Sequence, residues 1–330
     1  MPETKVERCH CAAPLRRLCD ECEGAGTSFL ACSLACLDRH RYAVHADLAQ
    51  DTVQRAQARI REQNRRRATD RESFADHEDP LMGLIGELPQ GAELCVFGAG
   101  DVDGLDLERL LDTFREIHLV DLDGEALTRE RDRQPAAVRG RIVLHDSIDA
   151  SGLLEHLDAW GERFPERAEL ARVAVEAAQS IVHGLGLSFP AVASNCVLSQ
   201  LALPFQRAWL TTRPNWADLL STISAIHLAT LAGATRAGGR CLLSFDVASS
   251  LDTPALAEQR GRSPDELAEF VLETRRAGGL TLRPDPGVLL TQLSAPGMKS
   301  LVHAPSLSEP WLRQRAADTE LVYGLIFSRV

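Results

Sequence analysis

The chain has 330 residues, which is enough for two domains or for one large domain with a small module. Hydrophobic residues make up 45% of it and charged residues 25%, values that exclude a largely disordered protein and are typical of a packed core. The formal net charge of −11 argues against broad nucleic-acid binding by the main part of the chain.

Targeting signals are not evident in the sequence. No apolar run follows a basic start, and no stretch reaches the roughly 18 uninterrupted apolar residues of a membrane span. We therefore expect a cytoplasmic protein with no membrane partner. Without a secretory signal, clustered cysteines are more typical of metal ligands than of disulfides.

Cysteines and histidines cluster within residues 1–46. The candidate ligands are Cys9, Cys11, Cys19, Cys22, Cys32, Cys36, His40 and His45. Eight sulfur and nitrogen ligands suffice for two tetrahedral Zn²⁺ sites. Because so short a segment cannot bury enough apolar surface to fold alone, zinc binding would supply the missing folding free energy. We predict a zinc module at 1–46, against the alternative of a disordered tail with free thiols.

This pattern resembles the MYND and HIT families of treble-clef zinc fingers. The resemblance implies a cross-brace with two ions. One ion would be held by Cys9, Cys11, Cys32 and Cys36, and the other by Cys19, Cys22, His40 and His45. It also implies that the finger recruits a protein or peptide partner and does not read DNA.

A basic helix is predicted next, at 47–67. It carries a loose apolar stripe (Leu48, Val53, Ala56 and Ile60), and residues 54–67 hold six arginines against one glutamate. Such a charge run indicates either a phosphate- or acid-binding patch or a solvated helix face between two domains. We favour the second interpretation because no aromatic residue is interleaved for base stacking. The sequence thus predicts a basic helical linker at 47–80.

From residue 81 onward, apolar runs alternate with helical patterns. We expect strands at 93–98, 117–121, 141–145, 190–194, 240–246, 288–293 and 321–329, and helices at 105–114, 124–133 and 216–235. Alternation of this kind predicts an α/β domain with a parallel sheet covered on both faces. A helical insertion at about 160–184 is expected over the carboxyl-end rim of the sheet, where ligands bind in open α/β folds.

Two glycines, Gly98 and Gly100, follow the first expected strand and flank Ala99. Glycine lets the backbone turn sharply and approach a ligand closely. Asp121 ends the second strand, where a carboxylate can accept hydrogen bonds from the ribose of an adenosine. A dinucleotide is disfavoured because Asp103 takes the place of the third glycine, and its charge would oppose the phosphates. S-adenosylmethionine has no phosphate and carries a positive sulfonium.

The order of these parts resembles a class I S-adenosylmethionine-dependent methyltransferase from about residue 81 to 330. The resemblance implies a doubly wound, seven-stranded, mostly parallel, Rossmann-like sheet. It implies that the cofactor is held by Gly98, Ala99, Gly100, Asp121, Leu122, Asp146, Ser147 and Ser194, with Asp146 accepting from the adenine amino group. Val96 stands where the family often has an acidic residue, and Val102 replaces a glycine.

Methyl transfer is an in-line displacement in which the protein mainly positions the reactants. By the same resemblance, Asn195 at the end of the fourth strand lies closest to the methyl group, although it equally suits a helix cap. The Asn-Pro-Pro-Tyr pattern of amino-group methyltransferases does not follow it, so methylation of DNA or glutamine is not supported. His227 is a candidate base, or else a core histidine of an apolar helix.

The sequence therefore predicts methyl transfer from S-adenosylmethionine to an unidentified small-molecule or protein acceptor, with the zinc finger recruiting a partner. The alternative is a non-catalytic adaptor in which the finger binds a peptide and the α/β domain is a degenerate scaffold. The changes at Val96 and Val102 motivate that alternative. A nicotinamide-dependent oxidoreductase is disfavoured by the charge at Asp103.

Overall fold

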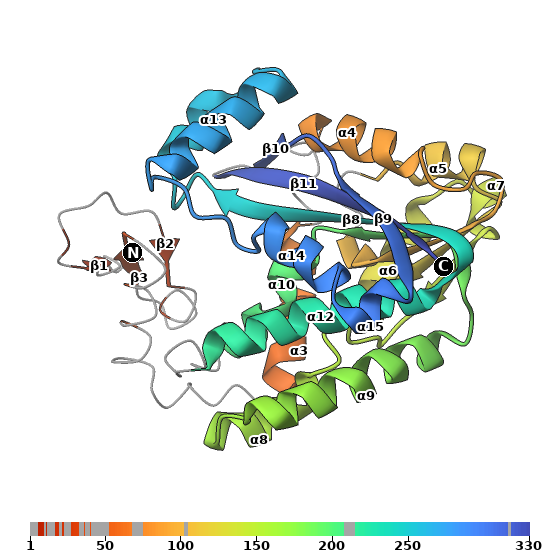
Figure 1. Ribbon diagram of the computed structural model, residues 1–330, viewed down its shortest axis with the longest axis horizontal. Coiled ribbons are helices and arrows are strands. Elements are labelled where there is room, and N and C mark those ends of the chain that lie inside the picture. The colour runs from red at the N-terminus through yellow and green to blue at the C-terminus, as the bar shows by residue number, and fades with distance from the viewer. Residues whose placement is uncertain are drawn as a thin grey trace, which may run out of the picture.

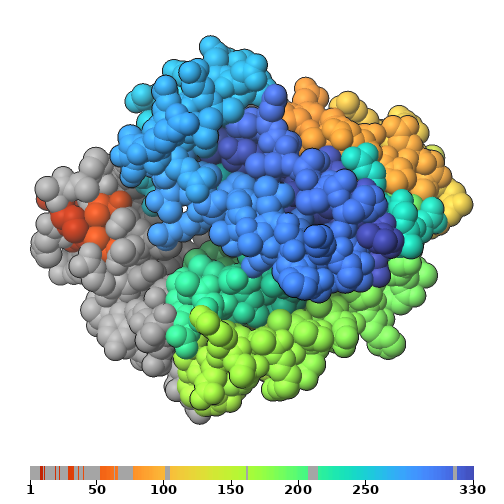
Figure 2. All heavy atoms as spheres, viewed as in Figure 1, coloured from red at the N-terminus to blue at the C-terminus, as the bar shows by residue number. Residues whose placement is uncertain are grey.

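A computed structural model describes residues 6–9, 11, 17–19, 22, 28–32, 36, 40, 53–67, 75–101, 105–207, 215–315 and 318–330. Near the N-terminus, β1 (Val6–Arg8), β2 (Arg17–Leu18) and β3 (Ser28–Ala31) form a small sheet with β3 in the middle. The rest forms one large α/β unit (Figure 1). The described atoms of the small sheet lie at the edge of the molecule in the space-filling view (Figure 2).

Five parallel strands form one half of the large sheet. In spatial order they are β6 (Ile142–His145), β5 (Glu116–Val120), β4 (Glu93–Phe97), β7 (Phe189–Asn195) and β8 (Thr235–Ser249). The chain moves outward from β4 through β5 to β6 and then crosses back to β7. The strand order therefore reverses between β4 and β7, which is the point where open α/β sheets bind ligands.

Three antiparallel strands complete the other half. β11 (Asp318–Arg329) pairs with β8 on one side and with β9 (Val302–Leu307) and β10 (Trp311–Arg315) on the other. The described sheet thus has eight strands, one more than expected. The predicted doubly wound, mostly parallel α/β class is confirmed, and so are the first five expected strands and the last one.

The prediction of a strand at 288–293 is wrong. That segment lies in helix α14 (Pro286–Leu293). Asp285 accepts a hydrogen bond from the Gly287 N–H at 2.8 Å, so it caps the helix, and Pro286 occupies the first turn, where its missing N–H costs nothing. Leu289 and Leu293 are buried one turn apart, so the apolar run has a helical period.

Helices cover both faces of the sheet. On one face lie α4 (Ala75–Ile85), α5 (Leu107–Thr113) and α6 (Gly124–Arg133). On the other lie α9 (Arg167–Leu185) and α12 (Trp216–Ala234), which pack together (Figure 1). The remaining helix of similar length is α13 (Pro264–Arg276), and the other described helical elements are η3 (Ala99–Asp101), α7 (Ala136–Arg139), η4 (Leu154–His156), α8 (Leu157–Glu162), α10 (Leu198–Leu201), α11 (Leu203–Arg207), η6 (Pro254–Gln259) and α15 (Pro296–Lys299).

The segment expected as an insertion at 160–184 is placed differently. Its main helix, α9, buries Leu170, Val173 and Ile181 in the core beside α12. It is therefore the crossover helix between β6 and β7 on a face of the sheet, and not a cap over its rim. Among the described helices, α12 alone is long and apolar enough to cross a membrane, and half of that stretch is buried inside the molecule.

Helix α3 (Val53–Arg67) lies within the segment expected as a linker, and it packs on the large unit. Ala56 is 2% exposed. The Val53 N–H donates to Asp158 Oδ1 at 3.1 Å, and Asn64 Nδ2 donates to Asp123 Oδ2 at 3.1 Å. The side of α3 that carries Ala56 and Asn64 is therefore packed on the large unit, whereas Arg55, Arg61 and Arg65 are exposed, as expected of a solvated basic face. The domain boundaries at 46 and 80 stay predictions.

Candidate functional site

A cavity opens where the strand order reverses, between the carboxyl ends of the parallel strands and helix α3. It encloses about 1020 Å³ of space, its open mouth included. The described residues that line it are Ala56, Arg59, Ile60, Asn64, Gly98, Val120, Asp121, Leu122, Ile148, Asp149, Ala150, Ser151, Leu154, Asn195, Val197, Gln200, Leu201, Leu203, Pro204 and Arg313. Of the residues predicted to hold the cofactor, this set includes Gly98, Asp121 and Leu122.

Asp121 is held in place by backbone groups at the end of β5. Its two carboxylate oxygens accept the N–H groups of Gly100 and Asp123, each at 2.9 Å. Burial raises the pKa of Asp121 to about 6, although these hydrogen bonds favour the charged form. Gly98, Gly100 and Asp121 therefore lie together at one edge of the sheet, as the sequence predicts.

Both glycines are required by close packing. Gly98 has φ +73°, and a Cβ atom there would lie 1.7 Å from Val197 Cγ2. A Cβ atom on Gly100 would lie 2.7 Å from Asp121 Cγ and 2.8 Å from Asn64 Nδ2. Ala99 and Gly100 themselves adjoin the cavity without lining it, because they turn into η3 directly behind Gly98.

The residues after β6 that line the cavity differ from those that the sequence predicts. Asp146 and Ser147 are exposed and lie outside the cavity lining, whereas the next four residues, 148–151, line it. Asp149 shapes this loop: its carboxylate accepts the backbone N–H groups of Ser151 and Leu154, each at 2.9 Å. The spacing Asp149 to Ser151, typical of a turn closed by an aspartate side chain, is the signal that could have found the loop.

Ser194 and His227 form a pair in the core and do not line the cavity. Their Oγ and Nε2 atoms are 2.8 Å apart, and both side chains are nearly inaccessible to solvent. Burial lowers the pKa of His227 to about 4. This placement matches the core-histidine interpretation of His227 and gives it no access to a substrate in the cavity.

Asn195 does line the cavity, and a buried polar network holds it. Its Oδ1 lies 3.2 Å from Nε2 of His77 and accepts from Ser244 Oγ at 3.0 Å. The Trp311 indole N–H donates to His77 Nδ1 at 2.9 Å. Sequence reasoning missed His77 and Trp311, since they are 234 residues apart and belong to α4 and β10.

Arg313 on β10 also lines the cavity, and the sequence did not indicate it. It is 2% exposed, its Nε donates to Glu320 Oε2 at 2.7 Å, and a guanidinium nitrogen lies 3.6 Å from Asp246 Oδ1. The two carboxylates fix this cation at the cavity wall. Arg59 from α3 is the other arginine of the described lining.

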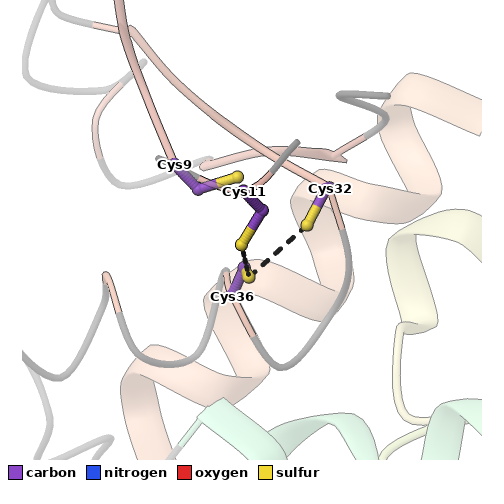
Figure 3. Close-up of side chains that lie close together, drawn as sticks. All are labelled: Cys9, Cys11, Cys32 and Cys36. Atoms are coloured by element: carbon purple, nitrogen blue, oxygen red, sulfur yellow. Dashed lines mark hydrogen bonds between the residues drawn. The ribbon is translucent and has the colours of Figure 1, made fainter. Parts of the chain in front are cut away.

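The N-terminal cysteines converge into one group. The sulfur atoms of Cys9, Cys11, Cys32 and Cys36 lie within 4.8 Å of one another (Figure 3). The sulfur of Cys36 is 3.4 Å from that of Cys11 and 3.5 Å from that of Cys32. Four thiolates around a tetrahedral zinc ion are about 3.8 Å apart, given a Zn–S bond of about 2.3 Å. This group could therefore hold a metal ion.

A second group contains Cys19, Cys22 and His40, whose ligand atoms also lie within 4.8 Å of one another. Cys22 Sγ is 3.1 Å from His40 Nε2, and the His40 ring stacks on Phe29. The two groups match the interleaved pairing that the finger resemblance implies. The predicted fourth ligand, His45, lies outside the described residues.

Comparison with known protein families finds none that matches this chain, and comparison with curated proteins finds none. Similar solved structures include TrmN from Thermus thermophilus (TM-score 0.36, 13% identity, 77% of this chain and 48% of that one). Another is the N-methyltransferase NodS from Bradyrhizobium japonicum (TM-score 0.35, 12% identity, 76% of this chain and 94% of that one). A third is a SAM-dependent methyltransferase from Anabaena variabilis (TM-score 0.36, 12% identity, 77% of this chain and 85% of that one).

The chain thus spans about half the length of TrmN. The mixed sheet and its strand order define the fold as a Rossmann-like, class I methyltransferase-like α/β fold.

Proposed function

We propose that this chain is an S-adenosylmethionine-dependent methyltransferase that acts on a small-molecule or protein acceptor in the cytoplasm. When bound, the cofactor supplies a methyl group on a positive sulfonium. The observation that carries the proposal is the meeting of Gly98, Gly100 and Asp121 at the point where the strand order reverses.

The cavity suits the parts of the cofactor. The Asp121 carboxylate would accept hydrogen bonds from the two ribose hydroxyls, and the apolar side chains of Leu122 and Ile148 would contact the adenine. Arg59 on α3, which lines the cavity, would form an ion pair with the cofactor's carboxylate. Asn195 would lie toward the reacting end, and the described lining beyond it is mostly apolar.

Isothermal titration calorimetry of the full chain with S-adenosylhomocysteine tests this proposal. We expect one site of micromolar affinity. Asp121→Asn keeps the shape and removes the charge, so its affinity should fall about 10- to 150-fold, from about 1.5–3 kcal/mol for a hydrogen bond to a charged group. The exposed Asp132→Asn is the matched control. No binding by the wild type at millimolar ligand would contradict the proposal.

We propose further that the N-terminal module holds two zinc ions and recruits a protein partner, and that neither part of the chain binds nucleic acid. The two ligand groups support the zinc sites. The partner rests on the finger resemblance. Affinity capture with the full chain and with Cys22→Ser tests it: a specific partner should be lost with the zinc, and equal capture by both would argue against recruitment through the finger.

A further inference from the structure

We propose that Asn64 of helix α3 is a positioning residue of the cofactor site. Through its bond to Asp123 it docks α3 against the cavity and holds in place the two N–H donors of Asp121. This inference rests on the proposed function, because Asp121 is the carboxylate assigned there to the cofactor's ribose. It predicts that the affinity for S-adenosylhomocysteine depends on a hydrogen bond between two protein side chains.

Asn64 reaches both of the residues whose N–H groups bond to Asp121. The Asp121 carboxylate accepts from Gly100 and from Asp123. Asn64 Nδ2 donates to Asp123 Oδ2 at 3.1 Å, and it lies so close to Gly100 that a Cβ atom there would be only 2.8 Å from it. Asn64 therefore packs against one donor residue and bonds to the side chain of the other.

The Asp123 side chain is held at both of its oxygen atoms. Oδ1 accepts the Ala126 N–H at 3.2 Å and so caps α6, and Oδ2 accepts from Asn64. Asp123 is 1% exposed, and a buried carboxylate is costly unless donors surround it. Because an ionised carboxylate only accepts, the amide atom of Asn64 that faces it is the donor Nδ2. Loss of this donor would let Asp123 shift, together with the backbone N–H that it offers to Asp121.

Two side-chain bonds described here join α3 to the start of α6, and they differ in burial. Asn64 is 7% exposed, so its bond to Asp123 is buried at both ends. The Arg65–Glu125 pair joins side chains that are 52% and 66% exposed. Exposed ion pairs contribute little, whereas a buried hydrogen bond to a charged group contributes more. Of these two bonds, the one from Asn64 is therefore the more important for docking α3 on α6.

Docking of α3 matters because this helix forms one wall of the cavity. Ala56, Arg59, Ile60 and Asn64 line it from successive turns of one helix face. A helix of 15 residues is marginal in water on its own, and Val53 and Ile60 are the only large apolar residues of α3. The fraction of molecules with α3 docked therefore sets the apparent affinity for a ligand that needs this wall. By reciprocity, the ligand should stabilise the docked helix.

Isothermal titration calorimetry with S-adenosylhomocysteine tests the bond in the full chain. Asn64→Asp keeps the size of the side chain but sets a second carboxylate against Asp123, so the affinity should fall at least about tenfold. Adding Asp123→Asn restores the pair with its roles exchanged, an amide at 123 donating to a carboxylate at 64, and asparagine still caps a helix. We expect this double variant to bind at least about fivefold more tightly than Asn64→Asp alone.

Arg61→Gln is the matched control, because Arg61 is exposed on the same helix and the substitution changes the net charge by the same amount as Asn64→Asp. Its affinity should equal that of the wild type. The proposal is overturned by a smaller fall in Asn64→Asp, by a smaller gain in the double variant, or by an equal fall in Arg61→Gln.

Hydrogen exchange of the same proteins separates positioning from unfolding. Without ligand, Asn64→Asp should speed the exchange of amides in 53–67 and leave those of β4 and β5 unchanged. S-adenosylhomocysteine should slow exchange in 53–67 of the wild type. Unchanged exchange in 53–67, or equal acceleration in the sheet, overturns the proposal. If the wild type binds no S-adenosylhomocysteine, the proposed function fails and this inference with it. If the wild type and Asn64→Asp bind equally well, only this inference fails.

Discussion

Gly100→Ala should weaken cofactor binding while leaving the chain folded. The added Cβ atom would lie 2.7 Å from Asp121 Cγ, whereas ordinary contacts begin at 3.4 Å, so one group must move by about 0.7 Å. Asp121 is pinned by two N–H groups, and Asn64 is bonded to Asp123, so neither side yields freely. The clash therefore displaces the carboxylate that would hold the ribose.

Loss of one charged hydrogen bond costs about 1.5–3 kcal/mol, which corresponds to an increase of about 10- to 150-fold in the dissociation constant. Calorimetry with S-adenosylhomocysteine measures this change, and a thermal melt should show destabilisation of about 1–3 kcal/mol from overpacking. Gly140→Ala is the control, since its Cβ would meet nothing within 4 Å. Wild-type affinity in Gly100→Ala would refute the reasoning.

Three further outcomes follow from the described residues. Since burial raises the pKa of Asp121 to about 6, protonation of this group favours the folded state at acid pH and that contribution is lost as the pH rises through about 6. Binding needs the ionised form, so the affinity for S-adenosylhomocysteine should fall by up to about tenfold per pH unit below 6; an equal affinity at pH 5 and pH 8 would contradict this. Elemental analysis should find two zinc ions per chain and one in Cys11→Ala, and retention of both by that variant would count against the first site. His227→Leu removes the bond to Ser194 and should cost about 1–3 kcal/mol of unfolding free energy with unchanged S-adenosylhomocysteine affinity. If His227→Leu bound S-adenosylhomocysteine more weakly at an unchanged melting temperature, the placement of His227 outside the site would be contradicted.

The parallel half of the fold could be predicted from the sequence because its strands are buried on both faces. In β4 and β5 the last four residues are all buried, and in β4 these four, 94–97, form a continuous apolar run. The antiparallel edge could not be predicted in the same way. β9 has five exposed residues in a row after Val302, so it lacks the alternation that marks a half-buried strand.

The site was predictable only where its residues follow a strand directly. Gly98, Asp121 and Asn195 are adjacent to or within strand ends, so the topology alone brings them together. His77 and Arg313 reach the same place from α4 and β10, and no spacing in the sequence shows that approach.

Helix α3 illustrates the same limit. Its arginines gave it the appearance of a solvated surface, but the composition of one helix does not show what the rest of the chain places beneath it. Ala56 and Ile60 lie on the face that covers the cavity, and Asn64 reaches Asp123 one turn further on. Only tertiary contacts reveal that face.

The most direct test is a crystal structure of the full chain with S-adenosylhomocysteine. The account predicts an adenosine between α3 and the strand ends, its ribose hydroxyls within hydrogen-bond distance of Asp121 and its adenine beside Leu122 and Ile148. A ligand bound elsewhere, or a cavity that stays empty at saturating ligand, would contradict the methyltransferase assignment.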